Sequence, residues 1–568
     1  MKKNRTETDY TKKDEENQKT NEEKIRPLKN RVEIMERIDK AELRKKIENS
    51  QTIEKGREGI AHVIFGRSMI IFALMLLQII LLFWGLTRLS EIWYAFSGIM
   101  TVLALVLVVH IINKTENPAY KLVWTVMILV VPLFGSAMYL FVEAQIGTKW
   151  INARLQYIHR DMKRYWAQKP EVMRRLAQED EQMASLGKYV SESGGYSIYE
   201  NTSAKYFPTG MDKFEELKTQ LQKAEKFIFM EYFIVSKGYM WDSVLEILKE
   251  KAKEGVEVRF MYDGMNTVAR LPYKYPEQLR SYGIQCHVFA HIRPSLSTRQ
   301  NNRDHRKIVV IDGHTAFTGG INLADEYINR KERFGYWKDT GIMIQGEAVR
   351  SFTLMFLEMW NVERYDMYDT YDKYLTAAAN REPKPGDGFV MPYGDSPVDS
   401  ENVGETVYMD ILNTAKRYVH IMTPYLILDN EMLTALKYAA KRGIDVKIIM
   451  PHIPDKWYAF VLAKTYYNEL LESGVKIYEF VPGFVHAKSF TSDDEKAVVG
   501  TINLDYRSLY LHFECAVMLY RNEAVAAVEK DFQDTLDKCI AVTPDDFGNQ
   551  PLRDQIAGKV FRLLAPLM

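Results

Sequence analysis

The apolar residues of this chain are distributed in two different ways. Between residues 68 and 142, three runs at 68–86, 92–112 and 122–142 contain no Asp, Glu, Lys or Arg. Each run has about the 20 residues that a helix needs to cross a bilayer. From residue 190 onwards, short apolar stretches instead alternate with helical patterns, which is typical of a soluble α/β region. The pattern therefore predicts a membrane anchor of N-terminal transmembrane helices over residues 68–143, followed by a soluble region.

The third apolar run differs from the other two, because Pro132 and Gly135 interrupt its middle. It either crosses the bilayer completely, or kinks and lies re-entrant or at the interface. Lys and Arg are abundant both before residue 68 and after residue 142, and the positive-inside rule places both flanks in the cytoplasm. We therefore expect a multi-pass protein of the cell membrane with a cytoplasmic soluble region, although three full crossings would not satisfy that rule.

The soluble region contains an internal repeat. Residues 247–261 closely echo residues 436–450, and in each copy a helical pattern ends at a glycine, Gly255 or Gly443, before an apolar strand begins. Strands that alternate with helices predict βαβ units and a largely parallel sheet in each half. The expected fold class is α/β, with two pseudo-twofold-related half-domains at 190–360 and 400–568 and a linker at 361–399. A site can then form between the halves, from one motif apiece.

Composition and charge narrow the class of protein. Residues 1–67 are rich in Lys, Glu, Asn and Gln, and predict a charged, largely disordered tail. Lys plus Arg and Asp plus Glu both total 75, so the chain lacks the basic excess that is typical of nucleic-acid-binding proteins. Cys286, Cys515 and Cys539 are scattered and support neither a disulfide framework nor a zinc site. We expect no metal and no cofactor.

A histidine motif occurs once in each half, with the same spacing both times. It consists of His-x-Lys, then an Asp, then an Asn after a short glycine-containing stretch. The residues are His305, Lys307, Asp312 and Asn322 in the first half, and His486, Lys488, Asp493 and Asn503 in the second. A single His-x-Lys triplet arises by chance, but two at corresponding points of an internal repeat strongly indicate a shared function.

The residue types of the motif suit chemistry at phosphorus. On a β-strand, a His and a Lys two positions apart project from the same face, so both can reach one pocket. An imidazole is a nucleophile at neutral pH, and a second, protonated imidazole can protonate a leaving alkoxide. Lysines and side-chain amides offer donors to phosphoryl oxygens, where negative charge develops. The motif therefore predicts phosphoryl transfer in which two histidines divide the roles of nucleophile and acid.

The duplicated motif resembles the HKD pattern of the phospholipase D superfamily over about residues 200–540. The three apolar runs and the final residues 561–568 are similar to those of bacterial cardiolipin synthases. The resemblance implies a ping-pong reaction through a phosphohistidine, in which one phosphatidylglycerol donates its phosphatidyl group to a second and glycerol leaves. It implies phospholipid substrates and a bilayer as partners, no nucleic acid, and leaves the oligomeric state open.

The resemblance also implies a role for each residue of the motif. His305 is then the nucleophile, and His486 the general acid and later base. Asp339 and Glu514 each orient a motif histidine, although Asp339 lies further from its asparagine than Glu514 does. The remaining residues are the phosphate-binding Lys307, Lys488, Asn322 and Asn503, and the motif aspartates Asp312 and Asp493, which we expect to hold the fold together.

Three alternatives stay open at this point. The motif determines the phosphoryl chemistry but not the acceptor, so a phospholipase D or another transphosphatidylase fits it equally. A phosphodiesterase acting on nucleic acid is disfavoured by the apolar runs and the neutral charge. A catalytically silent membrane scaffold belongs to a different class, and two intact motifs argue against it.

Overall fold

The computed structural model describes residues 76–77, 80–81, 90–144, 149–266, 270–290, 302–362, 371–379, 386–399, 401–544 and 550–567. The predicted tail at 1–67 and most of the first apolar run lie outside the described residues. The chain divides into two units, Met1–Ile99 and Met100–Met568. The features that follow belong to the second unit, which includes most of α3 (Ser90–Ile112).

The second and third apolar runs form three helices. The second run coincides with α3, whereas the third is divided into α4 (Pro118–Val130) and α5 (Pro132–Glu143). Pro132 has no N–H to continue the ladder and starts the new helix. Helices of 13 and 12 residues are only about 20 Å long, against about 30 Å of hydrocarbon.

Of the two alternatives for the third run, the structure shows the kinked one, because the run is divided at Pro132 and does not cross as one helix. The wider prediction of N-terminal transmembrane helices is not supported either. Throughout the described part of the chain, no helix combines the length and the apolar character that a bilayer crossing requires. One side of α3 packs onto α4 and α5, through Ala104, Leu107, Ile111, Trp124, Ile128 and Tyr139.

Helices also precede the first sheet. They are α6 (Lys149–Met162), η1 (Lys163–Trp166), α7 (Pro170–Glu179) and α8 (Glu181–Glu192). Asp180 caps α8 by accepting a hydrogen bond from the backbone N–H of Met183 at 2.9 Å. Buried residues of these helices, including Leu155 and Leu176, join the large core that spans both halves of the soluble region.

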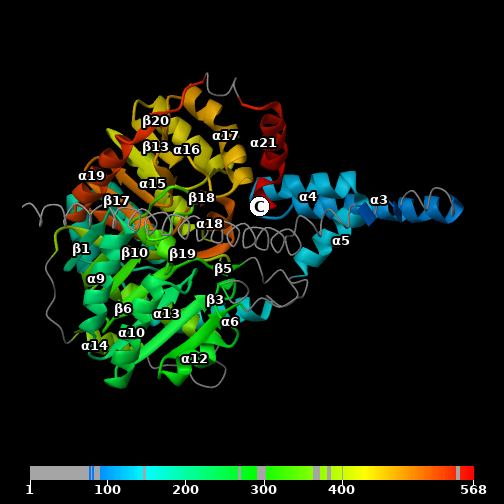
Figure 1. The fold of residues 1–568 in the computed structure, drawn as a ribbon. Coiled ribbons are helices and arrows are strands. Elements are labelled where there is room, and N and C mark those ends of the chain that lie inside the picture. Colours follow the sequence, from blue (N-terminus) through cyan, green and yellow to red (C-terminus); the bar gives the residue numbers. More distant parts are fainter. Residues whose placement is uncertain are drawn as a thin grey trace, which may run out of the picture. The chain divides into compact units, whose positions relative to one another are not determined.

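The first half contains a seven-stranded sheet in the order β1-β9-β7-β6-β2-β3-β4. Strands β1, β6 and β3 of this sheet are labelled in Figure 1. Its strands are β1 (Thr202–Phe207), β2 (Phe227–Tyr232), β3 (Glu257–Asp263), β4 (Gln285–Phe289), β6 (Lys307–Ile311), β7 (Thr315–Gly319) and β9 (Gly341–Gly346). Its helices are α9 (Gly210–Gln222), α10 (Tyr239–Lys253), α12 (Tyr275–Ser281), α13 (Val349–Val362) and α14 (Tyr371–Ala379), with η3 (Asp325–Ile328).

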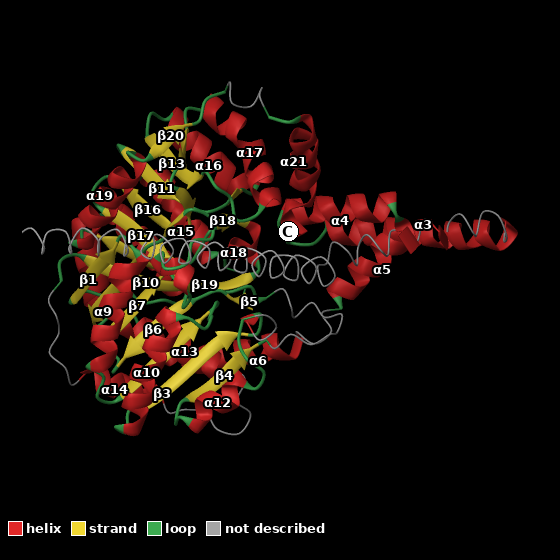
Figure 2. Cartoon of the chain, viewed as in Figure 1, coloured by secondary structure: helices red, strands yellow, loops and turns green. Residues whose placement is uncertain are grey.

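The second half repeats this order as β10-β19-β17-β16-β11-β13-β14, and adds β20 at the edge. Its strands are β10 (Phe389–Asp395), β11 (Tyr418–Met422), β13 (Asp445–Pro451), β14 (Lys476–Phe480), β16 (Ser489–Ser492), β17 (Lys496–Gly500), β19 (His512–Tyr520) and β20 (Cys539–Ala541). Its helices are α15 (Val403–Thr414), α16 (Asn430–Lys441), α17 (Trp457–Glu472), α18 (Tyr506–Tyr510), α19 (Ala524–Leu536) and α21 (Leu552–Leu564), followed by η4 (Ala565–Leu567). Helices flank the strands of both sheets (Figure 2).

The sheets are mixed, which corrects the prediction of largely parallel sheets. Along these two paths, in the part of the chain that the structure describes, only β2, β3 and β4, and their counterparts β11, β13 and β14, pair in parallel. The other pairings along the two paths are antiparallel. The predicted repeat at 247–261 and 436–450 covers only a helix and one parallel strand, so it carried no information on the antiparallel strands. Gly255 and Gly443 follow the ends of α10 and α16 with φ of +90° and +92°, as the left-handed end of a helix requires.

Strand β6 shows why the motif strands are continuously apolar. Ile308 and Val310 face the large core that is shared by both halves, whereas Val309 and Ile311 face a second core, made of first-half residues and Phe484. A strand that is buried on both faces needs apolar residues at every position. The motif histidine stands just before this rigid strand, which fixes its backbone.

Candidate active site

Short strands from each half pair across the boundary between the halves and bring the two motifs together. β5 (Arg303–Asp304) of the first half pairs with β19 of the second, and β15 (Gly483–Val485) of the second pairs with β8 (Tyr336–Lys338) of the first. The backbone N–H of His305 donates to the carbonyl of Phe513 at 2.9 Å, and that of His486 donates to the carbonyl of Lys338 at 2.6 Å. Each histidine is therefore held by the opposite half.

Each motif histidine also contacts a carboxylate from the opposite half. Nδ1 of His305 lies 2.8 and 2.9 Å from the two carboxylate oxygens of Glu514. Nδ1 of His486 lies 2.6 Å from Oδ2 of Asp339. A carboxylate on Nδ1 orients the ring and stabilises a proton on that nitrogen, which leaves Nε2 available for chemistry. The structure thus brings together all four of these predicted residues. In each pair, the histidine comes from one half and the carboxylate from the other.

The site is buried, which disfavours the charged forms of the motif lysines and histidines. Burial lowers the pKa of Lys307 to about 8 and the pKa of Lys488 to about 7. Burial, with the neighbouring Lys488, lowers the pKa of His486 to about 4. The pKa of His305 also falls well below its usual value, first through burial and then through Lys307. An anionic phosphate would supply the missing counter-charge, so it would raise these pKa values when it binds.

The two carboxylates differ in their electrostatic surroundings. Burial raises the pKa of Glu514 to about 8. Burial acts in the same direction on Asp339, but the charge and hydrogen bond of His486 outweigh it and lower the pKa of this carboxyl. The hydroxyl of Thr501 additionally donates to Glu514. The two histidines therefore have similar geometry but carboxylate partners of different basicity.

The two motif asparagines are placed differently. The side-chain oxygen of Asn322 accepts from the backbone N–H of Ile234 at 2.8 Å, and its amide nitrogen donates to the hydroxyl of Tyr327 at 2.8 Å. The side-chain oxygen of Asn503 is buried and has no hydrogen-bond partner among the residues that the structure describes. Asn322 therefore helps to fix the loop after β7, whereas Asn503 remains available to a ligand.

Asp312 and Asp493 point away from the chemistry. Oxygens of Asp312 accept backbone N–H groups of Glu225, Lys226 and Phe227 at 2.8–3.0 Å. Oxygens of Asp493 accept backbone N–H groups at the same place in the second half, from Lys416, Arg417 and Tyr418 at 2.8–3.1 Å. Each aspartate follows a motif strand and ties it to the start of the neighbouring strand, β2 or β11.

A buried ionic cluster lies beneath His305 and was not found from the sequence. Nε of Arg306 lies 2.7 Å from Glu231 and 3.4 Å from Asp304. The carboxylate of Asp263 accepts from the backbone N–H of Asp304 at 3.2 Å. These contacts fix β5, and therefore the histidine that follows it. Because Arg306 occupies the variable position of the His-x-Lys triplet, the motif itself gave no signal.

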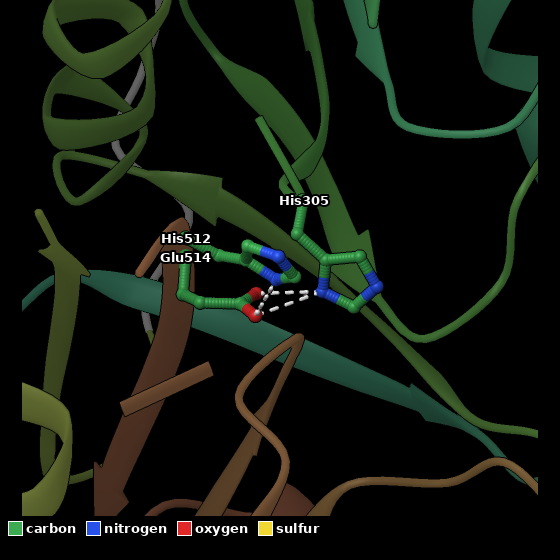
Figure 3. A group of neighbouring side chains, drawn as sticks. All are labelled: His305, His512 and Glu514. Atoms are coloured by element: carbon green, nitrogen blue, oxygen red, sulfur yellow. Dashed lines mark hydrogen bonds and ion pairs between the residues drawn. The ribbon is translucent and has the colours of Figure 1, made fainter. Parts of the chain in front are cut away.

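His512 is the second residue that sequence reasoning missed. Its ring lies 5.5 Å from that of His305, and its Nδ1 lies 3.9 Å from Glu514 (Figure 3). Within the described part of the chain, both ring nitrogens are buried without a hydrogen-bond partner, and burial holds the pKa of this imidazole well below its usual value. Its position two residues before Glu514 on β19 places both side chains on one face, which was the available signal.

The other half contains a matching arrangement. The ring of Trp337 lies 5.3 Å from that of His486, and its Nε1 donates to Asp339 at 3.5 Å. Trp337 precedes Asp339 by the same spacing that separates His512 from Glu514. Each orienting carboxylate thus has an aromatic ring beside it, an indole in one pair and an imidazole in the other.

His305, His512 and Glu514 also form a group of possible metal ligands, whose nitrogen and oxygen atoms all lie within 4.8 Å of one another. The charges of Arg507, Lys307, Arg303 and Lys456 all act on His512. The same positive field opposes a divalent cation at this place. The surroundings therefore favour neutral or anionic forms of these three side chains over a bound metal ion.

A small hollow is lined largely by apolar side chains, among them Met450, Ala459 and Phe460. Phe484 also lines it, and the Phe484 ring lies 5.9 Å from that of His486. Tyr425 lines the hollow as well and donates its hydroxyl to Asp455 at 2.7 Å. Phe484 therefore belongs both to this hollow and to the surroundings of the second histidine.

Comparison with known sequences places these features in a family. Residues 217–360 and 408–536 match a domain family described as "Cardiolipin synthase, PLD-like domain". Residues 102–143 match a family described as "Phospholipase_D-nuclease N-terminal". The first match covers both motifs, and the second covers part of α3 and all of α4 and α5.

Individual proteins agree with this assignment. The chain is 33% identical to a cardiolipin synthase of Geobacillus kaustophilus, over 83% of this chain and 94% of the relative. It is 33% identical to cardiolipin synthase 2 of Bacillus cereus, over 82% and 90% of the two chains. The crystal structure of phosphatidylserine synthase from Haemophilus influenzae shares the fold, with a TM-score of 0.50 and 14% identity over 64% of this chain and 95% of that one. This chain therefore belongs to the cardiolipin synthase family of the phospholipase D superfamily and is a phosphatidyltransferase.

Proposed function

We propose that this protein is a cardiolipin synthase, which transfers a phosphatidyl group from one phosphatidylglycerol to another and releases glycerol. The observation that carries the proposal is the pair of crossed contacts, 2.8 Å between His305 and Glu514 and 2.6 Å between His486 and Asp339. Two oriented imidazoles in one buried site supply both a nucleophile and an acid. The relatives that carry the name cardiolipin synthase support the choice of lipid substrate.

In the first half-reaction, Nε2 of His305 attacks the phosphorus of one phosphatidylglycerol. The bond between phosphorus and the glycerol oxygen breaks, and protonated His486 donates its Nε2 proton to that oxygen. Glycerol leaves, and the phosphatidyl group remains on His305. Lys307 and Lys488 come from opposite halves, and each lies close enough to act on both histidines. These ammonium groups, with the amide N–H of Asn503, would stabilise charge on the phosphoryl oxygens.

In the second half-reaction, a second phosphatidylglycerol takes the place of glycerol. His486 removes the proton from a headgroup hydroxyl, and the hydroxyl oxygen attacks phosphorus. The bond between phosphorus and His305 breaks, which releases cardiolipin and regenerates the free imidazole of His305 and the protonated form of His486. Assigning the nucleophile to His305 rests on the resemblance of the motif, since the two pairs have nearly the same geometry.

The lipid substrates also imply where the protein works. The helices that precede the soluble region expose apolar side chains, and the large ones on α3 and α4 are Phe96, Ile99, Val102, Leu105, Val106, Val109, Ile112, Leu122, Leu129 and Val130. An apolar surface of this kind is typical of a protein that contacts lipid. We propose that the enzyme is associated with the membrane that holds its substrates.

The test is incubation of the purified full chain with phosphatidylglycerol as the only lipid. Cardiolipin and glycerol in equal amounts are the expected products. Phosphatidic acid in place of cardiolipin would show that water is the acceptor and that the protein is a phospholipase D. The double variant His305→Asn/His486→Asn is the control, and turnover by the control would remove both histidines from the mechanism.

A further inference from the structure

The last helix of the chain, α21, is fixed to the second half along one side. Gly558 lets α21 approach α17 closely, since a Cβ there would lie 2.8 Å from the Thr465 side chain. Nη1 of Arg562 donates to the carbonyl of Thr465 at 3.0 Å. Phe561 contacts the ring of Trp457 edge-on, with 5.8 Å between centroids. The orientation of α21 about its own axis is therefore set by packing.

The outer side of α21 is apolar and basic. Leu552, Ile556, Val560 and Leu563 are 70%, 55%, 51% and 41% exposed. Their spacing of four, four and three residues places them in one stripe along the helix. The other exposed residues of α21 are Lys559, Arg553 and Arg562. Arg553 pairs with the less exposed Asp554 at 3.3 Å, and Arg562 pairs with Glu469 of α17 at 3.4 Å.

This stripe is continuous with two other parts of the described chain. Phe561 packs on Trp457 and Tyr458, which are themselves 50% and 39% exposed. They open α17, whose next residues, Ala459 and Phe460, line the hollow that Phe484 also lines. At the other end, Leu567 of η4 packs against the apolar cluster of α3, α4 and α5. The surface therefore runs from the membrane-associated helices to the edge of the site.

We propose that α21 and the first turn of α17 form a docking surface that lies on an anionic phospholipid bilayer and brings the edge of the active site to its substrates. We call this surface the α21 face, and define it by Leu552, Ile556, Val560, Leu563, Trp457 and Tyr458. The proposal rests on the proposed function, because it takes phosphatidylglycerol in a bilayer as the substrate.

Charge distinguishes a bilayer from a second copy of the chain. In a symmetric dimer the same patch faces itself, so Lys559 would approach its own copy at a cost in like-charge repulsion, and the paired Arg553 and Arg562 would add to this cost to a smaller extent. An anionic lipid surface instead neutralises them while the apolar stripe enters the boundary between headgroups and acyl chains. Exposed Trp and Tyr side chains also favour this boundary.

The position of the α21 face is tested by fluorescence on the full chain. A probe is attached to Ile556→Cys, in a Cys539→Ser background because Cys286 and Cys515 are buried. A second probe, at Lys530→Cys, serves as the control, since the Lys530 side chain is 74% exposed on α19. In vesicles that contain phosphatidylglycerol, nitroxide-labelled lipid should quench the probe at 556 and not the probe at 530. Equal access of aqueous iodide to both probes would overturn the proposal.

Activity gives the second test. The variant Ile556→Glu/Val560→Glu should turn over long-chain phosphatidylglycerol in vesicles about tenfold or more slowly, because two carboxylates must then approach an anionic surface. The same variant should convert water-soluble, short-chain phosphatidylglycerol at the wild-type rate. Lys530→Glu changes the net charge by the same two units at a distant place, and should leave both rates unchanged.

The remaining outcomes separate the two proposals. If the wild type converts neither long-chain nor short-chain phosphatidylglycerol, the proposed function fails, whatever the behaviour of α21. If Ile556→Glu/Val560→Glu slows both substrates equally, α21 supports the fold and the docking surface is wrong. If this variant converts a detergent-solubilised dimer to a monomer, the α21 face is covered by a second copy and the bilayer is wrong.

Discussion

His305 and His486 are equivalent in the motif, and their carboxylate partners are what distinguish them. Burial raises the pKa of Glu514 to about 8, whereas the pKa of Asp339 is lowered because His486 outweighs burial. His486 therefore has the more anionic partner, which favours the protonated form that an acid requires. This asymmetry agrees with the roles that we propose, in which His486 carries the proton and His305 attacks.

Replacing each histidine by asparagine tests these roles. His305→Asn and His486→Asn should each reduce conversion of phosphatidylglycerol by about 10²–10⁴-fold or more, since general acid–base catalysis alone supplies that much. Labelled lipid that remains on acid-quenched, denatured enzyme distinguishes the two variants. We expect some adduct on His486→Asn and none on His305→Asn.

Two results would change this picture in different ways. An adduct on His486 of the wild-type enzyme would reverse the two roles and keep the ping-pong scheme. Turnover without any adduct, in every variant, would show that the acceptor alcohol attacks phosphorus directly. The ping-pong scheme would then be wrong.

The buried position of Lys488 favours binding of an anionic ligand and lowers the stability of the native state. The pKa of Lys488 is lowered to about 7 by burial, whereas an unperturbed lysine has a pKa of 10.5. The buried ammonium therefore destabilises the native state at every pH below about 7, and the effect fades as the pH rises towards 10.5. A phosphate in the site would offset this cost, which explains why the lysine is placed there.

Lys488→Met, which retains much of the shape of the side chain, should therefore be inactive but more stable. At pH 6 the free energy of unfolding should rise by about 1–3 kcal/mol, as when other buried charges are replaced by apolar groups. The gain should shrink between pH 7 and pH 10. Urea unfolding at several pH values measures it, and Lys437→Met, at a partly exposed surface ion pair, is the control. A gain that grows with pH would contradict the lowered pKa.

At the scale of elements, the motif strand is anchored at both ends. β16 follows Lys488, and Asp493 comes directly after it and accepts the backbone N–H groups of Lys416, Arg417 and Tyr418. Those groups lie at and just before the start of β11, which pairs with β16. Asp493 thus fixes the register of the strand whose other end carries the phosphate-binding lysine.

Asp493→Ala should therefore affect folding more than chemistry. The loss of three accepted hydrogen bonds should reduce the free energy of unfolding by about 1–3 kcal/mol, and activity per folded molecule should stay within about tenfold of the wild type. Asp494→Ala is the matched control, because the Asp494 side chain is 60% exposed in a surface ion pair with Arg417, and such pairs contribute about 0–1 kcal/mol. A stable but inactive Asp493→Ala would place this carboxylate in the chemistry.

The elements also show what the sequence could and could not predict. The helix–strand repeat was visible because Gly255 and Gly443 end similar helices before similar strands. The antiparallel strands were not predicted, since nothing in a short apolar strand indicates the direction of its partner. The pairing of Asp339 with His486 was also beyond the sequence, because it depends on β8 and β15, strands of three residues each from opposite halves.

At the scale of the molecule, the site exists only because strands of one half pair with strands of the other, β5 with β19 and β8 with β15. The first half contributes His305 and the carboxylate that serves His486, and the second half contributes His486 and the carboxylate that serves His305. His512, which the motif did not include, follows the same rule, since it comes from the second half and lies beside His305. Neither half can therefore form a complete pair alone.

This arrangement makes a prediction about subunits, because both pairs are formed within one chain. A chain with His305→Asn retains His486 and Asp339, and a chain with His486→Asn retains His305 and Glu514, but neither has both histidines in one site. Co-expression of the two variants, with distinct tags for purification of mixed assemblies, should therefore leave phosphatidylglycerol conversion at the level of each variant alone. The control is co-expression of either variant with the wild type, which should give activity in proportion to the wild-type chains. Recovered activity in the mixed variants would show that strands such as β5 and β15 pair between chains, and that the working unit contains at least two of them.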